Sequence, residues 1–92
     1  MSRAGNAAAA AYGLLTAAGA PELPTDHFYR IKQDPHSDHV VRVEVRKVAE
    51  RIGSKALGSA TFSTRSGEPA LTATVAACHT ATAEAFPNGV PA

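Results

Sequence analysis

The segment that most constrains the fold is Val40–Val48, in which apolar and charged residues alternate. Val41, Val43 and Val45 share one face of an extended strand, and Arg42, Glu44 and Arg46 share the other. β-Branched residues at every second position suit a half-buried pleated surface. The pattern therefore predicts a sheet with one apolar face and one charged face.

The supply of large apolar side chains is small for a chain of 92 residues. Twenty residues are alanine, whereas only seventeen are Leu, Ile, Val or Phe. Alanine contributes little apolar area to a core, so a single domain of this size is expected to be marginally stable alone. Self-association is a common remedy. We expect one domain over residues 1–92, with loose tails at 1–5 and 87–92.

The predicted fold class is α+β, with an N-terminal alanine-rich helix packed on an antiparallel sheet of about four strands. Asn6 is a suitable N-cap, and Gly19 followed by Pro21 ends the helical pattern. Strands are expected at 27–33, 40–48, 55–64 and 70–80, with turns at 34–38 and 65–69 and a connection at 49–54. Residues 45–57 also carry a helical pattern, which Gly53 and Ser54 interrupt.

Histidines and aspartates gather around the expected first turn, where His36 and His39 have the spacing of two metal ligands. Imidazole and carboxylate groups bind zinc and similar divalent metals. Asp34, Pro35 and Asp38 are also ordinary turn formers. Turn composition explains most of this cluster, so no metal site is assigned and His36 and His39 are only weak candidates.

Cys78 and His79 have the residue types of a nucleophile and its base. On the expected strand at 70–80, however, neighbouring side chains point to opposite faces and cannot act together. Cys78 is therefore expected to be a small core residue and His79 a surface residue. No catalytic or cofactor-binding residues are predicted, and one cysteine excludes an intramolecular disulfide.

The expected order of elements resembles that of hot-dog thioesterases and dehydratases, with Thr72-Ala73-Thr74-Val75 similar to their last strand. The resemblance implies a dimer with an apolar tunnel that binds acyl-thioesters. A carboxylate at that tunnel would have to come from Glu44 or Asp26. The motifs that enter the helix of this family are absent from the chain.

Three functions follow from these observations. The first is a non-enzymatic structural or interaction subunit that self-associates or joins a ring, tube or virion-like assembly, with Arg42, Glu44 and Arg46 as the interface. The second is the acyl-thioester protein implied by the resemblance. The third is nucleic-acid binding, which the net charge of +1 argues against. Its basic residues would be Arg42, Arg46, Lys47, Arg51 and Lys55.

Two further expectations concern location. No apolar run approaches the ~20 residues that span a bilayer, so no membrane partner is expected. The alanine-rich N-terminus lacks the strongly apolar centre of a signal peptide, which argues against secretion. A cytoplasmic protein or a component of an assembled particle is expected.

Overall fold

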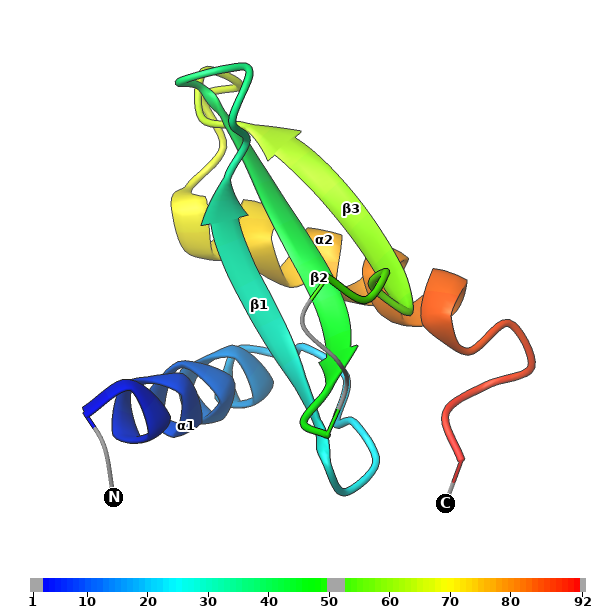
Figure 1. Ribbon diagram of the computed structural model, residues 1–92. Helices are drawn as coiled ribbons and strands as arrows, with labels where there is room; N and C mark the ends of the chain where they lie inside the picture. Colours follow the sequence, from blue (N-terminus) through cyan, green and yellow to red (C-terminus); the bar gives the residue numbers. More distant parts are fainter. Residues whose placement is uncertain (1–2, 50–52, 92) are drawn as a thin grey trace.

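The computed structural model describes residues 3–49 and 53–91, and Figure 1 shows its path. The chain runs through two helices and three strands in the order helix, three strands, helix. The elements are α1 (Arg3–Ala17), β1 (His27–Gln33), β2 (Val40–Lys47), β3 (Gly58–Ser63) and α2 (Ala70–Ala85). The α+β class and the N-terminal helix are confirmed, whereas the sheet has three strands rather than four.

The three strands form an antiparallel sheet with β2 in the centre. β1 pairs with β2 so that Tyr29 lies opposite Val45 and Arg30 opposite Glu44. β3 pairs with the other edge of β2, where Ser59 lies opposite Glu44 and Ala60 opposite Val43. The register therefore puts the β2 valines on one face of the sheet and its charged residues on the other, as the alternation predicts.

Helix α2 covers the valine face and crosses behind the strands in Figure 1. Val43, Val45 and Cys78 are fully buried between the sheet and α2. Among the residues whose burial the structure describes, nine are buried and apolar, and four of these are alanines: Ala20, Ala73, Ala77 and Ala81. The core is thus as poor in large side chains as the composition predicts.

The close packing of α2 depends on Gly58 at the start of β3. A Cβ at this position would lie 2.2 Å from the carbonyl oxygen of Ala81 and 2.5 Å from the backbone nitrogen of Ala85. Only glycine permits such an approach between two backbones.

The predicted strand at 70–80 is wrong, because Ala70–Ala85 is helical. Ala73, Ala77 and Ala81 recur every fourth residue and are all buried, which is helical spacing. Alanine is also the best helix former, and its abundance outweighs the strand preference of Val75 and the threonines. The order of elements behind the hot-dog resemblance is therefore not the observed one.

Helix α1 lies beside β1 and one end of α2 (Figure 1). It begins at Arg3, so Asn6 lies inside the helix rather than at its cap. Its end is as predicted: Gly19 has a φ of 111°, and the amide of Ala20 donates to the carbonyl of Leu15 at 2.9 Å. Leu15 is buried, and Tyr12 stacks on Tyr29 with ring centroids 5.9 Å apart.

Candidate functional site

The charged face of the sheet, opposite α2, is the main concentration of ionic side chains in the described residues. β1 contributes Arg30 and Lys32, and β2 contributes the predicted Arg42, Glu44 and Arg46. They line an open groove of about 370 Å³ that Ser59 of β3 and residues 53–56 also border. We call this region the basic groove; Lys55 and Glu84 complete its charged lining.

Glu44 lies at the centre of the basic groove and is only 5% exposed. Its carboxylate pairs with Arg46 at 3.1 Å and lies 3.9 Å from the ammonium of Lys32. Arg46 also donates to the backbone carbonyl of Ser54, which ties the connection before β3 to the sheet. Glu44 therefore pairs with two of its basic neighbours and holds them near the centre of the groove.

The other basic side chains of the groove have no carboxylate partner within the described residues: Arg30, Arg42 and Lys55. Of the described residues that line the groove, five are basic and two are acidic, Glu44 and Glu84, which leaves an excess of three positive charges among them. That excess is larger than the net charge of +1 of the whole chain. The groove is therefore a positive region on a nearly neutral domain, suited to an anionic ligand.

The structure brings together the three predicted interface residues with Lys55, which was predicted only for nucleic-acid binding, and adds Arg30 and Lys32, which were not predicted. Arg30 and Lys32 were missed because β1 was considered only for its aromatic and apolar residues. Arg30 and Lys32 are two positions apart on a strand, and this spacing, which places both side chains on one face, is the sequence feature that could have predicted them. Lys55 comes close only through the path of residues 53–57, which no local pattern predicts. Arg51 lies outside the described residues.

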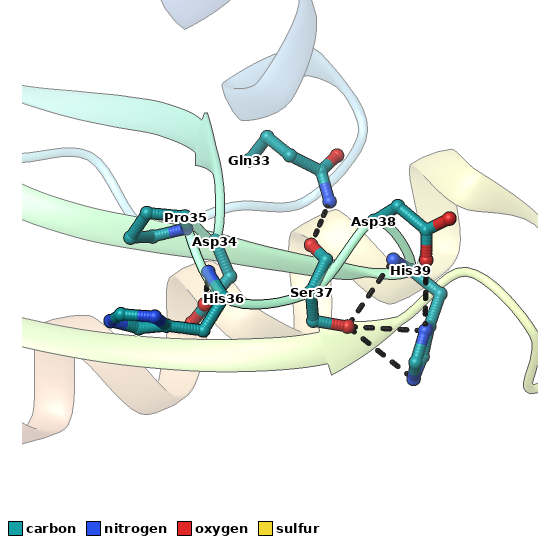
Figure 2. A pocket seen from close by; sticks show the side chains of 7 residues that line it. All are labelled: Gln33, Asp34, Pro35, His36, Ser37, Asp38 and His39. Carbon is teal, nitrogen blue, oxygen red and sulfur yellow. Dashed lines mark hydrogen bonds and ion pairs between the residues drawn. The ribbon is translucent and has the colours of Figure 1, made fainter.

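The histidine cluster lies on the turn between β1 and β2, and Figure 2 shows the two rings on opposite sides of it. Asp34 accepts a bond from the amide of His36 at 2.8 Å, as in an Asx turn. His39 contacts Ser37 at 3.1 Å and the carboxylate of Asp38 at 3.3 Å. No group of three metal-binding side chains occurs in the described part of the chain, and the contacts of Asp34 and His39 are with neighbouring residues of the turn.

Cys78 is a core residue and His79 a surface residue, as predicted. The predicted reason is wrong, because the two are neighbours on helix α2 and not on a strand. Cys78 is fully buried, and burial raises the pKa of its thiol to about 11. His79 is exposed and its Nε2 lies 2.9 Å from the carbonyl of Gly19, which links α2 to the end of α1. Cys78 therefore contacts the core, and His79 contacts the backbone beyond the end of α1.

A buried hydroxyl network joins the sheet to α2. The hydroxyl of Tyr29 donates to the carbonyl of Pro21 and lies 3.1 Å from the hydroxyl of Thr82. Burial raises the pKa of Tyr29 to about 12, an effect that the contact with Thr82 partly offsets.

Comparison with protein-family models, with curated proteins and with solved structures finds no match to this chain. Neither helix in the described residues has the length and apolar character needed to cross a membrane.

Proposed function

We propose that this domain is a non-enzymatic binding module whose basic groove docks on the phosphate backbone of a nucleic acid. The observation that carries the proposal is the excess of three positive charges in one groove. Phosphate contacts from Arg and Lys supply most of the affinity in sequence-independent binding. A contact of this kind needs no matching side-chain pattern on the partner, so the charged face of the sheet suits it.

The lining of the groove favours a nucleic acid over an acidic protein. Protein interfaces usually have a desolvated core with aromatic or aliphatic anchors. On the charged face of β1 and β2, the large apolar side chains among the described residues are Phe28 and Val40, and both are half-buried. Nucleic-acid interfaces are more polar and more positive, as this face is.

The net charge of the chain does not oppose this reading. Net charge is an average over all 92 residues, whereas a ligand responds to the local field within about 10 Å at moderate salt. Acidic residues elsewhere, including Asp34 and Glu68, are outside the basic groove and lower the average without occupying it.

The proposal is tested by fluorescence anisotropy with a labelled 20-nucleotide single strand and a 20-base-pair duplex, between 50 and 200 mM salt. The three unpaired cations predict a slope of log affinity against log salt of about −2 to −3. The double variant Arg30→Glu and Arg42→Glu should abolish binding, because it turns an excess of positive charge in the groove into a deficit.

The matched control is Lys47→Glu with Arg65→Glu, which makes the same change of net charge outside the basic groove. It should retain most of the wild-type affinity. Equal loss in both double variants would show that only net charge matters and would refute the site. Binding to polyglutamate but to neither oligonucleotide would assign the groove to an acidic protein instead.

A second candidate is the expected self-association, and a specific feature of β3 favours it. β3 is an edge strand whose six residues include no charge and no proline, whereas the opposite edge strand, β1, carries Arg30 and Lys32. Charge and proline are the usual protection of a sheet edge against further pairing. Two copies that pair through β3 form an isologous dimer, which the expected ring, tube or virion-like assembly would extend through a second interface.

Light scattering on a sizing column at two protein concentrations tests this candidate. The variant Thr61→Lys places a charge on the β3 edge and should convert an oligomer to a monomer. The control Gln33→Lys adds the same charge to the β1 edge and should leave the mass unchanged. A wild-type chain that is monomeric at both concentrations would rule self-association out.

A further inference from the structure

One donor in the basic groove has no acceptor. Among the described residues, the Nε of Arg42 is a buried side-chain nitrogen without a hydrogen-bond partner. A buried N–H of a guanidinium is costly to leave without an acceptor, and such orphaned groups are rare in native proteins. The free donor therefore indicates that an acceptor occupies this position in the working state of the protein.

The surroundings of Arg42 define the charge of that acceptor. Lys32 is its neighbour across β1 and Thr61 its neighbour across β3. Arg30 and Lys55 line the same groove and have no carboxylate partner in the described residues, whereas the one carboxylate on the central strand, Glu44, is held by Arg46 and Lys32. A neutral acceptor would leave these cations uncompensated, so the acceptor is an anion.

We infer that Arg42 forms a discrete phosphoryl-binding subsite within the basic groove, with its guanidinium donating to two oxygens of one phosphate group. The fork of Nε and Nη donors matches a tetrahedral oxyanion, and a hydroxyl or ammonium nearby supplies the third contact. This inference rests on the proposed function for the chemistry of the ligand. It adds that one phosphate of the ligand is held by hydrogen bonds of fixed geometry from Arg42, whereas the other phosphates are attracted by charge alone.

The test uses the full chain and the substitution Arg42→Lys, which keeps the charge but removes the Nε donor. NMR of the arginine Nε–H groups follows titration with sodium pyrophosphate and, separately, with the unlabelled 20-nucleotide strand. The Arg42 signal should shift and saturate with pyrophosphate, and Arg42→Lys should weaken pyrophosphate binding about tenfold or more. Arg65→Lys is the matched control outside the basic groove and should change affinity less than about twofold.

The two probes separate the sources of the phosphate and the two proposals. Saturation of Arg42 by both probes supports a subsite for backbone phosphates, and saturation by pyrophosphate alone supports a subsite for free phosphate compounds while the nucleic-acid proposal fails. If the oligonucleotide binds but the Arg42 signal moves with neither probe, the subsite is refuted and the wider proposal stands. Equal affinity of wild type and Arg42→Lys for pyrophosphate refutes the subsite as well.

Discussion

Replacing Gly58 with alanine tests the packing of α2 on the sheet, which also positions the basic groove on the opposite face. The new Cβ would lie 2.2 Å from the carbonyl oxygen of Ala81, which is more than 1 Å shorter than an ordinary contact distance. The two nearest atoms, the carbonyl oxygen of Ala81 and the backbone nitrogen of Ala85, belong to the backbone of α2, so neither can move aside as a flexible side chain would. The helix and β3 must therefore separate along their length.

Overpacking of this kind costs about 1–3 kcal/mol. The loss of glycine flexibility in the unfolded chain offsets some ~0.4–1 kcal/mol of that cost. A domain of this size has roughly 5–14 kcal/mol of total stability, and an alanine-rich core favours the lower part of that range. A net loss of about 2 kcal/mol would lower Tm by about 8–16 °C.

Thermal and urea unfolding followed by circular dichroism measure the effect. Gly13→Ala is the matched control, because it makes the same chemical change in α1 where nothing lies within 4 Å. Alanine in an exposed helix interior should raise stability by up to about 1 kcal/mol. A Gly58→Ala variant as stable as wild type, with Gly13→Ala behaving as expected, would refute the close approach of β3 and α2.

Three further predictions concern buried polar groups. Glu44→Gln should lower the free energy of unfolding, measured in urea, by about 1–3 kcal/mol, because Arg46 loses the negative charge of Glu44 beside it. The same variant should bind the oligonucleotide more tightly in the anisotropy assay. Unchanged values in both measurements would contradict the role assigned to Glu44. Tyr29→Phe should cost about 1–2 kcal/mol in urea unfolding, because the buried hydroxyl of Thr82 loses its partner; a stability equal to wild type would exclude the network. The raised pKa of Cys78 predicts that stability falls by about 1.4 kcal/mol per pH unit above pH 9, where the thiol ionises only in the unfolded state. Unfolding at pH 8, 9 and 10 should show a shallower fall in Cys78→Ala, and parallel slopes would contradict the prediction.

The strands could be predicted where period-two alternation is strong. β2 was predicted nearly to the residue, since Val41, Val43 and Val45 alternate with charges, and Gly19 and Pro21 located the end of α1. Ala70–Ala85 was misassigned because threonine and valine favour strands when they are considered alone. Alanine at every fourth position indicates a helix, but alanine also fits strand positions that accept only a small side chain, so the spacing alone does not decide between the two.

The site was predictable only along single strands. Arg42, Glu44 and Arg46 share a face by alternation, so their grouping follows from the sequence. Their meeting with Arg30 depends on the register between β1 and β2, which the six-residue turn sets. The net charge of +1 concealed the result, because an average carries no information on where charges gather.

The alanine-lined contact between α2 and the sheet also has a calorimetric consequence. Alanine side chains have no rotamers to lose on burial, so this interface forms with little conformational entropy cost as well as little apolar area. Because apolar exposure dominates the heat capacity of unfolding, ΔCp should lie below the usual ~12–15 cal/mol/K per residue. A small ΔCp flattens the dependence of stability on temperature, so the domain should hold a nearly constant, modest stability over a wide temperature range.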